Sequence, residues 1–220
     1  MKIVLIGYRP WALSAFETIT KQKPNIEFTT INNPTELLKV ESSIILGAGW
    51  SWVINQDLLN KNKITALVHP SDLPEYAGGS PIQHQIIDGL TCSKATLFEV
   101  TKDIDSGPIL YKTDLCLKGH MDQIFNNLRD CTVKLFLQFI DNYPNLPRQR
   151  QNPKKIYRRI KPEDSKFLKS EISRMTAKQL YNYIRCKESP YPNMYIEDKS
   201  GKLYFKKVEF IPNDNELPPI

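Results

Sequence analysis

Three short, continuous apolar runs, at residues 2–7, 43–47 and 64–68, constrain the fold of this 220-residue chain more than any other feature. Each has the length of a strand, and such runs are typical of strands buried on both faces, as in parallel sheets that helices cover on two sides. Residues 26–31 alternate enough for a further strand. The strand–helix–strand order predicts an α/β fold: an open, mostly parallel sheet with helices on both faces.

Helical patterns separate these runs. A helix is expected from Pro10 or Trp11, with proline tolerated in its first turn. Its inner face would consist of Ala12, Ala15, Phe16 and Ile19. Further helices are expected at 34–40, 50–59 and 81–87, and strands at 95–100 and 109–117. The clearest helical periodicity covers residues 121–140, with Met121, Ile124, Phe125, Leu128, Leu135, Phe136 and Phe139 on one face.

A cluster of prolines at positions 144, 147 and 153 predicts the end of the main domain. We therefore expect a domain at residues 1–147 and a small α+β extension at 148–220. The extension would hold a polar loop (158–166), a helix (176–185) and a hairpin. The hairpin strands are expected at 194–197 and 202–210, turning at 198–201, with a frayed tail at 213–220.

Composition and spacing argue against several classes of protein. No apolar run approaches the roughly 18 residues that span a bilayer. Gly7, Arg9 and Pro10 end the first run too early for a signal peptide. The four scattered cysteines form neither a CxxC pair nor a zinc module. We expect a cytoplasmic protein with reduced thiols, no metal and no membrane association.

Positive charge concentrates in residues 148–187, which carry 13 lysines and arginines against three acidic residues. Such a stretch is either a solvated basic face or a surface that attracts an anionic partner, such as a phosphate or a nucleic acid. The charge by itself does not separate these readings.

Two residues are candidates for acid–base chemistry. His69 directly follows the run at 64–68, and ligands of open α/β sheets bind beyond the carboxyl ends of the strands. A stiff loop with three prolines and two glycines follows it, and histidine is suited to proton transfer near neutral pH. Asp105 lies in a turn at 103–108. Its carboxylate could cap that turn, or it could orient the imidazole of His69.

The stretch from Leu67 to Gly107 resembles the formyltransferases that use 10-formyltetrahydrofolate. Their hallmark is Asn-x-His-x-Ser-x-Leu-Pro, a glycine-containing loop ending in proline, and an Asp-x-Gly turn about 35 residues after the histidine. The matching positions are His69, Ser71, Leu73, Pro74, Gly78, Pro81, Asp105 and Gly107. The resemblance implies a Rossmann-like catalytic domain over about residues 1–140. It also implies acid–base chemistry by His69 and Asp105, through a tetrahedral intermediate.

One position departs from that pattern, because the family's asparagine falls on Leu67. In the family this amide helps to hold the formyl oxygen as it becomes negative, and one such donor is worth on the order of 3 kcal/mol. Replacement donors could come from Ser71, Gln83 or the backbone of Gly78 and Gly79. Otherwise the protein would be slow, or a catalytically impaired homologue that binds folate or a nucleotide.

The resemblance also implies where the substrates bind. The pterin would lie in the pocket after the third strand, which maps onto Leu46, Gly47, Ala48, Trp50 and Trp52, with Ser106 and Gly107 nearby. The acceptor could be an amino sugar carried on a nucleotide, as in surface-polysaccharide and lipopolysaccharide (O-antigen) biosynthesis. Candidate contacts for it are Tyr8, Arg9, Trp11, Tyr157, Arg158 and Arg159.

A methionyl-tRNA formyltransferase is the alternative, although its C-terminal barrel is larger than the residues left here. We expect small-molecule partners rather than nucleic acid. A homodimer, paired through the edge of the final hairpin, is expected from the family.

Overall fold

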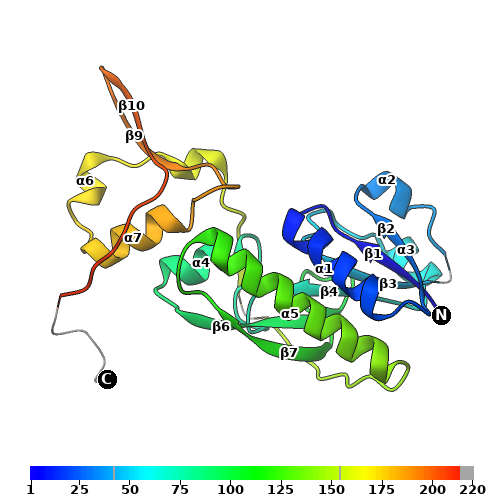
Figure 1. Cartoon of the computed structure of the whole chain (residues 1–220). Coiled ribbons are helices and arrows are strands. Elements are labelled where there is room, and N and C mark those ends of the chain that lie inside the picture. Colours follow the sequence, from blue (N-terminus) through cyan, green and yellow to red (C-terminus); the bar gives the residue numbers. More distant parts are fainter. Residues whose placement is uncertain (42, 154, 214–220) are drawn as a thin grey trace.

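A computed structural model describes the chain except for residues 42, 154 and 214–220, so most of the expected frayed tail lies outside the described residues. Figure 1 shows a sheet with helices on two sides and a separate C-terminal region from which a hairpin protrudes. The strands of the sheet are β1 (Lys2–Ile6), β2 (Glu27–Ile31), β3 (Ile44–Ala48), β4 (Ile64–His69), β6 (Cys92–Glu99) and β7 (Ile109–Cys116).

The sheet has the order β2-β1-β3-β4-β6-β7. Its first four strands are parallel, whereas β6 and β7 run antiparallel to their neighbours. The mostly parallel α/β architecture expected from the apolar runs is therefore confirmed. Strand β3 is buried along its whole length, as its apolar run predicted.

Helices cover both faces of the sheet. On one face α1 (Pro10–Gln22), α4 (Pro81–Ile87) and α5 (Met121–Asn142) enclose the largest apolar core. The buried residues of α1 are Ala12, Ala15, Phe16 and Ile19, as its periodicity predicted. On the other face lie α2 (Pro34–Leu37) and α3 (Gln56–Lys61), which contribute to a smaller core.

The helix expected over residues 50–59 is wrong in its first half. Residues 50–55 are irregular, and α3 begins only at Gln56, where the Asn55 side chain accepts a hydrogen bond from the Leu58 amide. The apolar side chains Trp50 and Ile54 mimic a helical face, because they pack on the smaller core from a loop and also line a cavity. This displacement leaves a loop beside the carboxyl ends of β3 and β4.

The C-terminal region has a small apolar core of its own, built on Phe167, Ile184 and Met194. The expected helix and hairpin are present. Its elements are η1 (Pro162–Ser165), α6 (Lys169–Ile172), α7 (Ala177–Arg185), β9 (Met194–Asp198) and β10 (Gly201–Phe205). None of the helices in the described part of the chain is long and apolar enough to cross a membrane.

The segment that joins the two regions lies against the sheet domain. Gln149 forms a bridge with Ile109, and the Gln151 side chain donates to the carbonyls of Asp105 (3.0 Å) and Gly107 (2.7 Å). Next, β8 (Ile156–Tyr157) pairs in parallel with β5 (Ala77–Gly78) in the loop after His69. Residue 147 stays the proposed boundary in sequence, but in space residues 149–153 and 155–160 complete the surroundings of that loop.

Candidate functional site

The fold brings His69 and Asp105 together. His69 is the last residue of β4 and Asp105 lies in the turn between β6 and β7. The imidazole Nδ1 lies 3.4 Å from Asp105 Oδ2, and both side chains are largely buried. The same Oδ2 accepts a hydrogen bond of 2.8 Å from the Gly78 amide. The carboxylate therefore reaches across to the loop after His69 and orients that loop as well as the ring.

Both ring nitrogens of His69 face oxygen acceptors, because Nε2 lies 2.9 Å from the Tyr76 carbonyl oxygen. A neutral imidazole can donate at only one nitrogen, whereas an imidazolium donates at both. The ring is thus held from two sides, by the Asp105 turn and by the loop. A substrate atom that bonds Nε2 would have to displace the Tyr76 carbonyl.

Backbone strain concentrates around this pair. Tyr76, Ser80 and Asp105 all adopt left-handed conformations, with φ of 55°, 54° and 47°. Such conformations cost an ordinary L-residue roughly 1–2 kcal/mol each. Strained non-glycine residues that cluster at one place are typical of a functional site whose surroundings impose the geometry.

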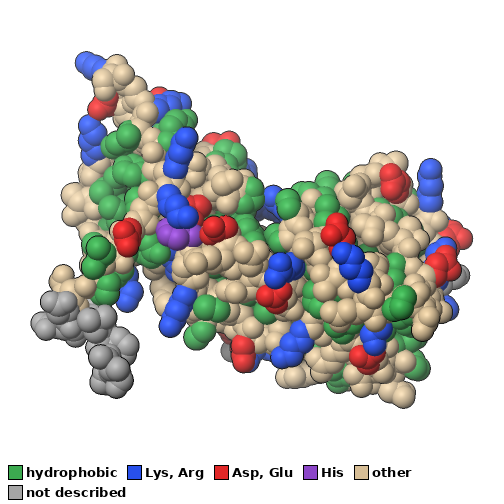
Figure 2. All heavy atoms as spheres, viewed as in Figure 1, with side chains coloured by type: hydrophobic (Ala, Val, Ile, Leu, Met, Phe, Trp, Pro, Cys, Tyr) green, Lys and Arg blue, Asp and Glu red, His purple; other side chains and the backbone are tan. Residues whose placement is uncertain are grey.

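His69 and Asp105 open onto a cavity of about 570 Å³ at the carboxyl ends of β1, β3 and β4. We call its two walls the α5 side and the α3 side, after the core to which each belongs. The α5 side consists of Trp11, Ile82, Gln83, Phe125, Leu128 and Tyr191, and the α3 side of Trp50, Ile54, Leu67, Phe98 and Val100. On the face seen in Figure 2, a notch separates the C-terminal region from the part of the sheet domain around α1.

Tryptophans and exposed apolar residues dominate the α3 side and its rim. Trp50 and Trp52 meet edge to face at 4.8 Å between ring centroids, and Tyr8 lies 4.8 Å from Trp52. Val53 (93% exposed) and Ile104 (59%) extend this apolar surface to the cavity mouth. Such exposure is unfavourable unless a ligand covers it.

Several residues expected near the pterin do not line the cavity. Leu46, Gly47 and Ala48 are buried within β3. Ser106 and Gly107 lie behind Asp105. At Gly107 a Cβ atom would lie 1.7 Å from the Glu99 carbonyl oxygen, so only glycine permits this approach of the two backbones. Tyr8 also lies outside the lining, and its hydroxyl pairs with Ser51 at 2.8 Å.

Two positive charges of the site lie near Tyr191 on the α5 side, and a third, Lys102, also lines the cavity. Arg9, Arg159 and Tyr157 line the cavity. Arg158 does not, because its guanidinium forms a two-pronged ion pair with Asp164 at 2.7 Å. Gly78 and Gly79 let residues 157–159 approach closely. A Cβ on Gly79 would lie 2.5 Å from the Arg159 backbone.

The expected replacements for the missing amide donor are already engaged within the protein. The Ser71 hydroxyl donates to the Glu75 carbonyl (2.6 Å), the Gly78 amide to Asp105 and the Gly79 amide to the Tyr157 carbonyl (2.8 Å). Gln83 lines the cavity, with one N–H donated to the Cys186 carbonyl at 3.1 Å. Leu67 itself lines the cavity and presents no donor there.

Sequence reasoning did not assign Phe125, Lys102 and Tyr191 to the site, although all three line the cavity. Phe125 was expected as a core residue on the inner face of α5, and its neighbour Leu128 is fully buried. Tyr191 stands between two prolines, far from the motifs around His69. No local pattern marks it, because only the folding of the C-terminal region over α4 and α5 brings it there.

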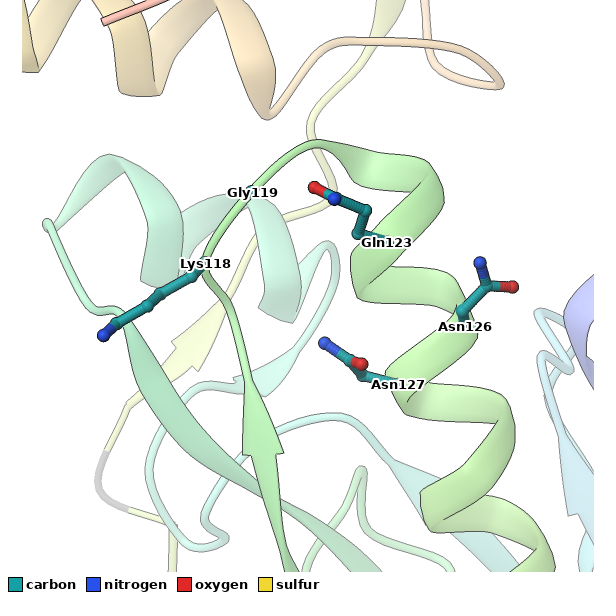
Figure 3. Close-up of a pocket in the computed structure, with 5 residues that line it drawn as sticks. All are labelled: Lys118, Gly119, Gln123, Asn126 and Asn127. Atoms are coloured by element: carbon teal, nitrogen blue, oxygen red, sulfur yellow. The ribbon is translucent and has the colours of Figure 1, made fainter. Parts of the chain in front are cut away.

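A second hollow is lined by no histidine or carboxylate in the described part of the chain. It lies where β7 leads into α5 and is lined by Lys118, Gly119, Gln123, Asn126 and Asn127. Figure 3 shows the Lys118 side chain pointing away from the three amides. Nowhere in residues 1–41, 43–153 and 155–213 do three or more His, Cys, Asp or Glu side chains gather to hold a metal ion.

Comparison with known proteins connects this site to one family. The family model described as "Formyl transferase" matches residues 20–140. The methionyl-tRNA formyltransferase of Lactobacillus delbrueckii subsp. bulgaricus is 27% identical over 188 residues, which is 83% of this chain and 59% of that protein. The chain therefore spans about three fifths of this relative's length.

Solved structures show the same fold. A methionyl-tRNA formyltransferase from Clostridium thermocellum has a TM-score of 0.85 at 25% identity, covering 96% of this chain and 94% of that one. A 4-N formyltransferase from Francisella tularensis has a TM-score of 0.76 at 20% identity, covering 96% and 98%. HypX from Aquifex aeolicus in complex with tetrahydrofolic acid has a TM-score of 0.74 at 17% identity, covering 90% and 36%.

Proposed function

The chain belongs to the formyl transferase family, and on that premise we propose that it transfers a formyl group from 10-formyltetrahydrofolate to the primary amine of a nucleotide-linked amino sugar. The observation that carries the proposal is the two-sided cavity with His69 and Asp105 at its centre. A transfer between two substrates needs two adjoining binding surfaces, and the walls differ in chemistry as two different substrates would require.

The α3 side suits the folate. Its tryptophans and exposed apolar rim match a flat heterocycle with an aromatic extension, and aromatic surfaces of this kind contribute strongly to ligand binding. Trp50 and Trp52 would contact the ligand. Leu46, Gly47 and Ala48 would support it from below, within β3. The solved complex of HypX with tetrahydrofolic acid supports this assignment by likeness of fold.

The α5 side suits an anionic acceptor. Arg9 and Arg159 can pair with phosphate oxygens, and guanidinium groups do so with two parallel hydrogen bonds. Trp11 offers a ring face for a base or a sugar, and Tyr157 lines the same cavity. Tyr157 is itself fixed between Tyr76 and His84, at centroid distances of 5.0 and 4.8 Å.

At the centre, His69 would accept the proton that the attacking amine loses, and would return a proton to the leaving nitrogen. Asp105 holds the ring at Nδ1 and stabilises the charged form that arises. No metal takes part in this scheme. Leu67 leaves the negative formyl oxygen without the family's amide, so we expect slow turnover unless Gln83 moves to serve it.

A methionyl-tRNA formyltransferase is the second candidate, favoured by the relatives named above. The basic residues 148–187 support this second candidate less than their total charge suggests. Six of these basic side chains have partners within the protein. Four pair with carboxylates (Arg148, Arg158, Lys166 and Lys169), and two are buried (Arg185 and Lys187). In Figure 2, Lys and Arg are interspersed with Asp and Glu.

The test is direct. Purified protein is incubated with 10-formyltetrahydrofolate and a panel of nucleotide-linked amino sugars, and separately with methionyl-tRNA, and N-formyl products are identified by mass spectrometry. Formylation of a sugar nucleotide supports the proposal. Transfer to methionyl-tRNA alone would reverse the ranking. Folate binding without turnover on any acceptor would indicate a catalytically impaired homologue.

A further inference from the structure

The α5 side of the cavity contains an aromatic wall made from three distant parts of the chain. The Trp11 and Phe125 rings are nearly parallel, with an interplanar angle of 6° and a centroid distance of 6.4 Å. Tyr191 continues the wall, with its ring centroid 6.0 Å from that of Phe125. All three residues line the cavity. Tyr191 brings a hydroxyl to this wall, and Arg9 and Arg159 lie near enough to act on its pKa.

Tyr191 is partly exposed at the cavity, and its hydroxyl makes no hydrogen bond to another residue in the described part of the chain. Burial raises the pKa of Tyr191, and the positive charges of Arg9 and Arg159 oppose that rise. The phenol is therefore a neutral donor close to two guanidinium groups. An anionic ligand group in the cavity could accept a hydrogen bond from this hydroxyl.

The segment that carries Tyr191 is firmly held. The Glu188 carboxylate pairs with His120 Nδ1 at 2.7 Å and accepts from the Met121 amide at 3.1 Å. The buried Arg185 donates to the carbonyls of Leu117 (2.8 Å) and Gly119 (2.9 Å). Both anchors lie at the start of α5, the helix that contributes Phe125. Tyr191 is thus preorganised relative to the cavity, as a specificity-determining residue requires.

We infer that Tyr191 selects the acceptor of the proposed function. Its hydroxyl donates a hydrogen bond to the phosphate group that Arg9 and Arg159 bind, while its ring extends the aromatic wall. This inference rests on the proposed two-sided cavity. It differs from that proposal in predicting a contact that only one of the two substrates makes.

The test compares Tyr191→Phe with Tyr195→Phe, a matched control on the hairpin outside the cavity lining. Tyr191→Phe should raise KM for the acceptor about tenfold, the effect of one hydrogen bond to a charged group. KM for 10-formyltetrahydrofolate should stay unchanged, as should both values in Tyr195→Phe. Equal changes in both KM values, or no change in either, would overturn the inference.

A binding experiment separates this inference from the proposed function. Quenching of tryptophan fluorescence by a nucleoside diphosphate alone needs no formyl transfer, and Trp11 reports from the same wall. Weaker quenching in Tyr191→Phe than in the wild-type protein supports the role of Tyr191, even if no formyl product is found. A wild-type protein that binds no nucleoside diphosphate would overturn it.

A different observation concerns the far end of β6 and β7. Cys92 and Cys116 are exposed and stand directly opposite each other in the antiparallel register. The next pair outward is hydrogen-bonded, since the Leu117 amide donates to the Thr91 carbonyl at 2.9 Å. Because hydrogen-bonded and non-hydrogen-bonded pairs alternate, the two cysteines form a non-hydrogen-bonded pair, with Cα atoms about 4.5 Å apart and side chains on one face.

The structure assigns to this pair a redox modification, an intramolecular cross-strand disulfide. The Cα separation lies within the range of disulfides, roughly 4.4–6.8 Å. With glutathione disulfide as oxidant, one cysteine attacks the reagent and releases one glutathione. The other cysteine then displaces the second glutathione, forming the S–S bond. The two cysteines lose two electrons and two protons, and the reagent becomes two glutathione molecules. The crosslink would brace the strand end beside Leu117 and Gly119, which anchor Arg185.

Treatment of the full-length protein with glutathione disulfide, followed by peptide mass mapping, tests this assignment. We expect a Cys92–Cys116 crosslinked peptide, unmodified Cys131 and Cys186, and a melting temperature raised by about 5 °C or more. In Cys92→Ser, Cys116 should acquire a single glutathione instead, and dithiothreitol should reverse both products. Two separately glutathionylated cysteines in the wild-type protein, with no crosslink, would refute the assignment.

Discussion

The substitution Leu67→Asn would restore to the site the amide that the family uses, and the structure allows its effects to be worked out. Leu67 lies in β4, two residues before His69, and its side chain lines the cavity between two apolar clusters. An asparagine side chain there would point into the same cavity as His69. A donor that meets the developing oxyanion is worth on the order of 3 kcal/mol, so kcat should rise about a hundredfold.

The same change removes apolar contacts. Full burial of a leucine is worth about 1.5–3 kcal/mol, and because Leu67 is only partly buried we expect a loss of roughly 1–2 kcal/mol in the free energy of unfolding. That corresponds to a melting temperature lower by about 2–8 °C. Kinetics with saturating 10-formyltetrahydrofolate and thermal unfolding measure the two effects separately.

Leu67→Ala is the matched control, because it removes the leucine contacts without adding a donor. It should lose at least as much stability as Leu67→Asn and should show no gain in kcat. A folded Leu67→Asn protein that binds folate but turns over no faster than wild type would refute the reasoning. It would mean that another group already fills the oxyanion position.

Three further predictions follow from single contacts. Asp105→Asn removes the charge beside His69, so kcat should fall by about 10²–10⁴-fold while the circular dichroism spectrum is preserved. An unchanged kcat would contradict the role assigned to Asp105. Gly79→Ala places a methyl group against the Arg159 backbone. It should lower the free energy of unfolding by about 1–3 kcal/mol, measured by chemical denaturation, and raise the KM for the acceptor, measured by kinetics. The ion pair with Arg158 holds the pKa of Asp164 below its ordinary value, so its contribution to stability is present above about pH 4 and is lost as the pH falls further. The stability difference between wild type and Asp164→Asn, measured by urea unfolding, should therefore shrink between pH 7 and pH 3, and a constant difference would argue against this linkage.

Local patterns in the sequence were sufficient to predict most of the fold. Continuous apolar runs identified β1, β3 and β4, and helical spacing identified the buried faces of α1 and α5, because side-chain periodicity directly reflects which face meets the core. The prediction failed at residues 50–55, where Trp50 and Ile54 pack on the smaller core and line a cavity without forming a helix. Hydrophobic periodicity indicates that a side chain avoids water. It does not indicate whether that side chain contacts a neighbouring helix or a ligand.

For the site, the sequence by itself pointed to His69 and Asp105 as candidate groups, since one ends a strand and the other lies in a turn, and the missing amide at Leu67 follows from the resemblance to the family. Only the tertiary structure decided what surrounds them. In the folded protein, the Ser71 hydroxyl and the amides of Gly78 and Gly79 donate hydrogen bonds to other residues. Arg158 pairs with Asp164, and Tyr191 lies beside Phe125. These outcomes depend on contacts between segments far apart in the chain, where a donor is free or engaged according to what packs against it.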